Sequence, residues 1–171
     1  MLKLSDQLIG QPVLSLRTGQ EIARLTAAIF NPNNLKIEGF YCQDKFNRDE
    51  LVLTYQDIRD FIPQGVVVND HDVLVAAQEL VRLKSILDIE FELVGKRVVT
   101  LSKQRLGRVA DYSIEIETMY VQKIYVSQGV LKGLTRGSLG IDRSQINEIT
   151  DTKIIVNDLL DRATVPSGAM A

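Results

Sequence analysis

Two side chains in this sequence have types that could bind a metal or attack a substrate, and each stands alone. His71, in "NDHD", is the only histidine, and Cys42 is the only cysteine. A zinc site needs three or four converging ligands. A nucleophilic cysteine needs a neighbouring base or a lowered pKa, and no histidine besides His71 could serve. We therefore expect His71 to be a polar helix cap and Cys42 a buried small residue, with no metal, no cofactor and no enzymatic activity.

The basic segment 96–108 is the strongest candidate for a binding surface. It contains no acidic residue, and residues 91–171 carry a net charge of +2 although the whole chain is at -2. On a hairpin these cations would gather around one turn, where they could meet RNA phosphates or an acidic protein surface. The segment has no aromatic residue of the kind that stacks on bases, and ordinary solvated charge is the alternative. The cations are Lys96, Arg97, Lys103, Arg105 and Arg108.

The glycine-rich segment "GVLKGLTRGSLG" (129–140) could suggest a phosphate-binding loop. It lacks the Gly-Lys-Ser/Thr that follows four spacer residues in such loops, and no helix is expected after it. An extended loop between two strands is the expectation, and a weak anion-binding or partner-binding loop is the alternative.

The composition is that of a globular protein, with 45% apolar and 25% charged residues. No uncharged apolar run approaches the roughly 18 residues that a membrane helix needs. The first ten residues lack the apolar core of a signal peptide, and a lone cysteine fits a reducing compartment. We expect a cytoplasmic protein that does not insert into a membrane.

The chain contains an internal repeat with an offset near 85 residues. The order of the matching segments is kept, and the offset changes only at turns. A period this long indicates duplication of a small domain and not a solenoid. The matches are "LIGQPVLSL" with "LVGKRVVTL", "KIEGFY" with "YVQKIY", "YQDIRDFI" with "RSQINEIT", and "VVVND" (66–70) with "IIVND" (154–158).

Each copy has the composition of short strands separated by turns. β-Branched and aromatic residues dominate "KIEGFYC" and "VQKIYVS", and "RTGQ", "NPNN" and "SKQR" are turn-forming clusters. Between the copies, apolar residues from Val73 to Leu87 recur at three- and four-residue steps, which predicts an amphipathic helix over 71–90. Residues 159–171 end the chain without periodicity, and we expect a disordered tail.

Both copies resemble PRC-barrel domains. "LIGQPVLSLRTGQEIARL" and "LVGKRVVTLSKQRLGRV" resemble the opening strands of that family, "VQKIYVS" its third strand and "IDRSQINEITDTKIIVND" its closing strands. The resemblance covers residues 4–70 and 91–158. The first copy departs from the pattern, because Ala23 stands where the second has Gly107.

The resemblance implies a mainly β protein: two small six-stranded antiparallel PRC-type barrels in tandem, at 1–70 and 91–158, joined by one helix. Similar domains form the cytoplasmic part of the photosynthetic reaction centre H subunit and the C-terminal domain of a ribosome maturation factor. The family has no common catalytic residues, and it implies an adaptor that binds another macromolecule, most simply a protein. RNA or ribosome-assembly binding through 96–108 is an alternative. A small-molecule sensor, or an enzyme whose site forms only in three dimensions, is an alternative of another class.

Overall fold

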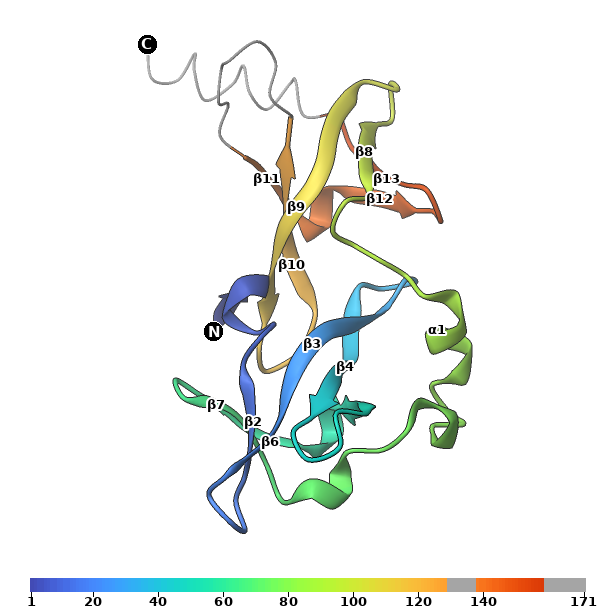
Figure 1. The fold of residues 1–171 in the computed structure, drawn as a ribbon. Coiled ribbons are helices and arrows are strands. Elements are labelled where there is room, and N and C mark those ends of the chain that lie inside the picture. Colours follow the sequence, from blue (N-terminus) through green and yellow to red (C-terminus); the bar gives the residue numbers. More distant parts are fainter. Residues whose placement is uncertain (129–137, 159–171) are drawn as a thin grey trace. The chain divides into compact units, whose positions relative to one another are not determined.

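The structure, a computed structural model, describes residues 1–128 and 138–158 and consists mainly of β-strands (Figure 1). The expectation of a mainly β fold is confirmed. The disordered tail expected at 159–171 lies outside the described residues, and so does the extended loop expected at 129–140, apart from its last three residues.

The first sheet is formed by the first copy of the repeat. Its strand order is β5-β4-β3-β2-β7-β6. Side chains of one face of these strands alternate into a core, where Ile37, Phe40 and Leu53 are fully buried. The strands are β2 (Pro12–Ser15), β3 (Glu21–Asn31), β4 (Lys36–Asp44), β5 (Glu50–Thr54), β6 (Ile58–Ile62) and β7 (Gly65–Val68).

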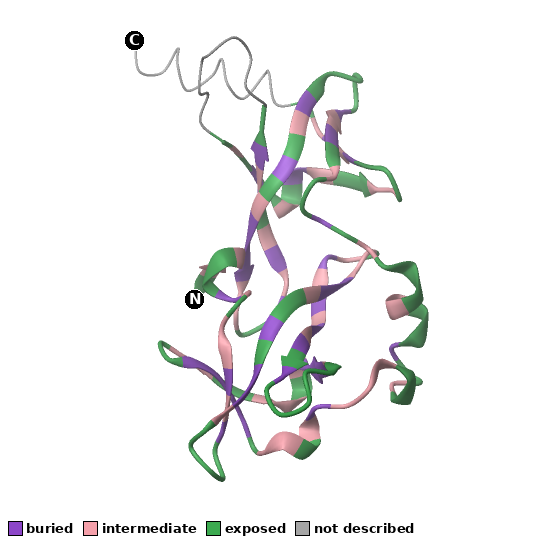
Figure 2. Cartoon of the chain, viewed as in Figure 1, coloured by how far each residue is buried: buried purple, intermediate pink, exposed green. Residues whose placement is uncertain are grey.

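The second sheet repeats this order with the strands of the second copy, as β11-β10-β9-β8-β13-β12. It gains one further strand, because β1 (Leu2–Leu4) pairs with β9. Figure 2 shows buried residues interspersed with exposed ones along the first part of β9, whereas 112–114 are buried in succession. The strands are β8 (Arg97–Thr100), β9 (Arg105–Glu115), β10 (Val121–Ser127), β11 (Leu139–Asp142), β12 (Ile146–Ile149) and β13 (Lys153–Val156).

The predicted antiparallel pairing is wrong for one strand pair in each sheet. β2 pairs parallel with β7, and β8 pairs parallel with β13. The reason lies in the 3₁₀ turn Tyr55–Asp57 between β5 and β6, and in its counterpart Arg143–Gln145. The pairing directions require that the strands before and after this turn run the same way. The chain therefore reverses direction one time fewer than six strands joined only by antiparallel connections would. As a result, the last strand runs parallel to the first.

Positions related by the sequence offset have equivalent roles in the two sheets. Gly10 and Gly95 both have φ of 91°. The Gly10 amide donates to the Leu25 carbonyl at 2.7 Å, and the Gly95 amide donates to the Val109 carbonyl at 2.7 Å. Val68 and Val156, the valines of "VVVND" and "IIVND", are both fully buried and accept from the amides of Leu16 and Leu101, each at 2.9 Å.

The aspartates that close these two motifs are also held alike. Asp70 accepts from the Ser15 hydroxyl at 3.1 Å, and Asp158 accepts from the Ser102 hydroxyl at 2.8 Å. The pKa of Asp70 is lowered, first by a hydrogen bond with the His71 backbone. The pKa of Asp158 is lowered by the side chain and then the backbone of Ser102. Each carboxylate thus fastens the residues that follow the last strand to the end of the first strand or to the turn after it.

We expect Asp158 to make stability depend on pH in the acid range. A carboxyl group whose pKa is lowered by folding stabilises the native state above its unfolded pKa, near 3.8. That stabilisation is lost as the pH falls through the lower, folded value. Urea unfolding should therefore show the parent chain losing its advantage over Asp158→Asn below about pH 4. Asp151→Asn, which removes a carboxylate that accepts no hydrogen bond from the described residues, is the control. A difference in unfolding free energy between the parent chain and Asp158→Asn that stays constant with pH would contradict the prediction.

The chain divides into two compact units whose bounds differ from the predicted 1–70 and 91–158. The first unit contains Met1–Glu92 together with Ser113–Gln122, and the second contains Leu93–Tyr112 and the described residues from Lys123 onward. The tip of the β9–β10 hairpin, although it belongs to the second copy of the repeat, is therefore part of the first unit.

This tip pairs with the tip of the equivalent β3–β4 hairpin inside the first unit. The Ile37 amide donates to the Met119 carbonyl at 2.8 Å, and the Val121 amide donates to the Leu35 carbonyl at 3.0 Å. Lys36 and Tyr120 face each other in an isolated antiparallel bridge. An offset of 84 relates residue 36 to 120, 37 to 121 and 35 to 119. The repeat therefore relates the two hydrogen bonds to each other.

The helix predicted over 71–90 is wrong for most of that range. Only Lys84–Ile89 is α-helical (α1), after short 3₁₀ turns at His71–Val73 and Ala77–Glu79. Val75 instead exchanges two backbone hydrogen bonds with Val52 of β5, at 2.7 and 3.1 Å. β5 ends the strand order of its sheet, so its edge needs backbone partners. Pairing with that edge is incompatible with a helical backbone at residue 75.

Candidate basic binding site

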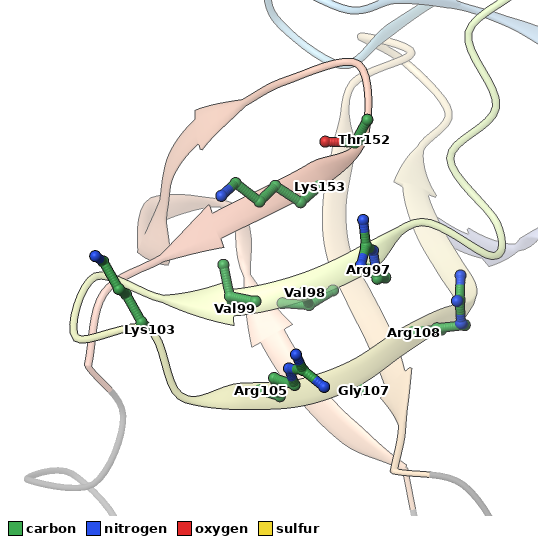
Figure 3. Close-up of a pocket in the computed structure, with 9 residues that line it drawn as sticks. All are labelled: Arg97, Val98, Val99, Lys103, Arg105, Gly107, Arg108, Thr152 and Lys153. Atoms are coloured by element: carbon green, nitrogen blue, oxygen red, sulfur yellow. The ribbon is translucent and has the colours of Figure 1, made fainter.

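A pocket of about 570 Å³ opens on the second unit, over the β13-β8-β9 part of its sheet. Figure 3 shows Arg97, Val98 and Val99 on β8, Lys103 in the turn after it, and Arg105, Gly107 and Arg108 on β9. Thr152 and Lys153 line the pocket from the start of β13. Five of these nine residues are cationic and none is acidic. The volume lies in the range typical of ligand-binding pockets.

The register of the sheet places three of the cations side by side. Arg97 is the direct partner of Lys153 on β13 and of Arg108 on β9. Neighbouring strands lie about 4.8 Å apart, so the three Cα atoms fall within roughly 10 Å. Like charges directly opposite each other destabilise a sheet. An anion held at this row would relieve that repulsion.

The cations of the pocket are not neutralised by the part of the chain that the structure describes. All five are exposed, and among the described residues none of them forms an ion pair. Arg108 alone is held by a side-chain hydrogen bond, because its guanidinium donates to the Gly95 carbonyl at 2.9 Å. The other cationic side chains have no hydrogen-bond partner among the described residues and are available to a ligand.

Four of the five cations that the sequence singled out line this pocket, and Lys96 does not. The Lys96 ammonium reaches the turn before β13, where it donates to the carbonyls of Thr150 at 3.3 Å and Asp151 at 2.7 Å. Sequence reasoning missed Lys153. The repeat does indicate that "KIIV" is a strand of the second copy. It does not indicate that this strand, β13, pairs parallel with β8, and only that pairing brings Lys153 beside Arg97.

The first unit shows what this face looks like without the basic residues. At the positions equivalent to Arg97, Lys153 and Arg105 stand Pro12, Gly65 and Glu21, as the matching strand pairings show. Arg24 is the counterpart of Arg108, and it likewise donates to a glycine carbonyl, that of Gly10, at 3.1 Å. The Arg24 charge is paired with Glu21 at 2.8 Å. The same sheet therefore forms without a basic face, and the cations of the second unit are not needed to build it.

His71 does not cap a helix. Its Nε2 lies 2.9 Å from Oδ1 of Asp44, whose side chain is only 1% exposed, and its ring meets Phe46 edge-on. The Asp44 carboxylate also accepts from the Phe46 amide, so the pair fastens residue 71 to the turn after β4. Cys42 is fully buried, as expected. Burial, helped by Asp44 and Glu50, raises the pKa of its thiol to about 12, so this thiol is protonated at neutral pH.

A smaller hollow of about 290 Å³ lies in the first unit, between β3, β4 and the segment containing α1. Its lining includes Phe30 and Phe91, whose rings meet edge-on at 6.2 Å, and three glutamates. Burial and the nearby charges of Glu50 and Glu90 raise the pKa of Tyr41 beside it. This hollow has the opposite charge to the basic pocket.

Within residues 1–128 and 138–158, no three or more His, Cys, Asp or Glu side chains are grouped closely enough to hold a metal ion. The helices in the same described part of the chain are too short to span a membrane. A scan against protein-family models finds no match for this chain, and a search of curated proteins finds none either.

Proposed function

We propose that this protein is a non-enzymatic adaptor that binds an acidic segment of a protein partner in the basic pocket of the second unit. The row Lys153, Arg97 and Arg108 carries the proposal, since these three cations lie in register and no acidic side chain of residues 1–128 and 138–158 forms an ion pair with them. The first unit supports it, because there the equivalent face has one arginine, and that arginine is paired. A charged face that the sheet does not need is best explained by a partner.

An acidic protein segment fits this pocket better than a nucleic acid strand. Proteins that hold single strands stack the bases on aromatic side chains, and the nine lining residues include none. The chain has a net charge of -2, so no overall field attracts it to nucleic acid. RNA remains the partner to test against.

The proposal extends to the fold family and the location. Each copy would be a PRC-type β-barrel, and the shared six-strand order of the two sheets supports this. The barrel would act as a scaffold for a surface that differs from copy to copy. A cytoplasmic location, inferred from the sequence, belongs to the same proposal.

Capture of a partner tests the proposal. The variant Arg97→Ser/Arg105→Ser/Lys153→Ser removes three cations that have no side-chain hydrogen bond within the described residues. We expect its affinity for the captured protein to fall about 3- to 150-fold, since one exposed ion pair contributes about 0.2–1 kcal/mol. Binding is measured at low salt with immobilised protein, because screening weakens exposed charges.

The matched control is Lys45→Ser/Arg48→Ser/Arg82→Ser, which removes the same charge from exposed positions of the first unit. It should bind as the parent chain does. Equal capture by both triple variants would show that the basic pocket is not the binding surface. Loss of the partner on ribonuclease treatment would show that RNA, and not an acidic protein, occupies it.

A further inference from the structure

The charge gathered in the basic pocket exceeds what one carboxylate can balance. Arg97, Arg108 and Lys153 supply three positive charges across three adjacent strands, and Lys103 and Arg105 add two at the rim. A glutamate or aspartate side chain would bring a single negative charge. A phosphate monoester carries about -1.5 to -2 at pH 7 and offers three strongly accepting oxygens.

The geometry of the row also suits a phosphate group. Two arginines that flank each other on β8 and β9 present planar forks, which can donate bidentately to phosphate oxygens, and Lys153 adds a compact charge from the other side. Val99 and Gly107 line the pocket between the charges without adding a polar group or an acid. The volume of about 570 Å³ leaves room for the residue that carries the phosphate and for its neighbours.

Resting on the proposed function, we infer that the basic pocket recognises a phosphorylated residue of the protein partner, with Arg97, Arg108 and Lys153 as the phosphate-binding residues. Recognition of phosphorylated segments by arginine clusters is a general mode of peptide binding. Phosphorylation of the partner would then switch the interaction on.

The pH dependence of binding distinguishes a phosphorylated ligand from a ligand that carries only carboxylates. The second ionisation of a phosphate monoester has a pKa near 6, whereas carboxylates keep their charge from pH 7.5 to 5.5. Within the described residues, the charged groups that line the pocket are two lysines and three arginines, and no histidine or carboxylate is among them. Binding of a phosphorylated ligand must therefore weaken over this interval, and binding of a carboxylate ligand must not.

The test uses the full chain and labelled nine-residue peptides of glycine, serine and glutamate that differ only at the central residue. Fluorescence anisotropy compares phosphoserine, serine and glutamate at that position, together with a ten-nucleotide single-stranded RNA. We expect phosphoserine to bind about tenfold or more tightly than either counterpart, since it adds charge-assisted hydrogen bonds. Affinity for that peptide should fall severalfold from pH 7.5 to 5.5, and inorganic phosphate should compete.

Variants locate the site and separate the possible failures. Arg108→Ser should lower phosphopeptide affinity about tenfold, whereas Arg24→Ser, which loses the equivalent hydrogen bond to a glycine carbonyl, should leave it unchanged. Arg97→Ser, which removes no intramolecular hydrogen bond within the described residues, should act as Arg108→Ser does.

Equal binding of the glutamate and phosphoserine peptides, both lost in Arg97→Ser, would overturn the phosphate inference and leave the proposed adaptor function standing. Tighter binding of RNA, unchanged between pH 7.5 and 5.5, would overturn both. Binding of none of the probes would overturn the phosphate inference, and partner capture decides the adaptor separately.

Discussion

Replacing Ile114 by alanine is expected to lower the free energy of unfolding by about 2–5 kcal/mol. Ile114 is fully buried, and it lies in the hairpin segment Ser113–Gln122 that completes the first unit. Removing its outer carbons loses their transfer energy and leaves a cavity that a close-packed interior only partly fills. Urea unfolding followed by circular dichroism measures the change.

Hydrogen exchange shows where this destabilisation acts. If the hairpin tip completes the first unit, Ile114→Ala should speed amide exchange at Ile37, whose amide donates to Met119. Ile89→Ala is the control, because Ile89 is 51% exposed and its truncation should cost little. Faster exchange confined to residues 93–112 would mean that the tip belongs with the second copy after all.

Gly107→Ala is expected to cost at least about 3 kcal/mol, from two sources that add. Its φ of 133° is a conformation that residues with a side chain rarely adopt. A Cβ atom there would also lie 2.1 Å from the backbone carbonyl oxygen of Ser127, so β9 or the end of β10 would have to move. Thermal and urea unfolding of the full chain measure the loss.

Two other glycines of the second unit separate these sources. Gly95 has a φ of 91° but open space where a Cβ atom would stand, so Gly95→Ala should cost only the backbone strain, about 1–3 kcal/mol. Gly140 has neither a positive φ nor a close backbone atom, and its alanine variant should change stability by less than about 1 kcal/mol. A loss in Gly107→Ala no larger than that in Gly95→Ala would show that the approach of Ser127 is readily relieved.

The sequence predicted the strands because each repeated segment has a local pattern that survives folding. "KIEGFY" lies in β4 and "YVQKIY" overlaps β10, with the matched 3₁₀ turns at offset 88. Such patterns depend only on neighbours along the chain and on one core face.

The misplaced helix and the missed lysine have a different origin, since both depend on contacts distant in the sequence. Residues 73–87 have helical periodicity, but Val75 pairs with Val52 at the edge of β5. This tertiary contact overrides a weak local preference for helix. Lys153 joins the basic pocket only because β13 runs parallel to β8. No local sequence pattern indicates whether a strand pairs parallel or antiparallel with a strand distant in the sequence.

The assignment of Ser113–Gln122 to the first unit has a consequence for synthesis on the ribosome. Leu35 and Ile37 cannot acquire their hairpin partners when residue 92 has been made, because those partners, Val121 and Met119, are added only after a further 29 and 27 residues. At about 5–20 residues per second, translation leaves an interval of roughly 2–6 s in which this edge is unpaired. A nascent chain stalled within that interval would present an open strand edge, and the order of folding is thereby tied to the order of translation.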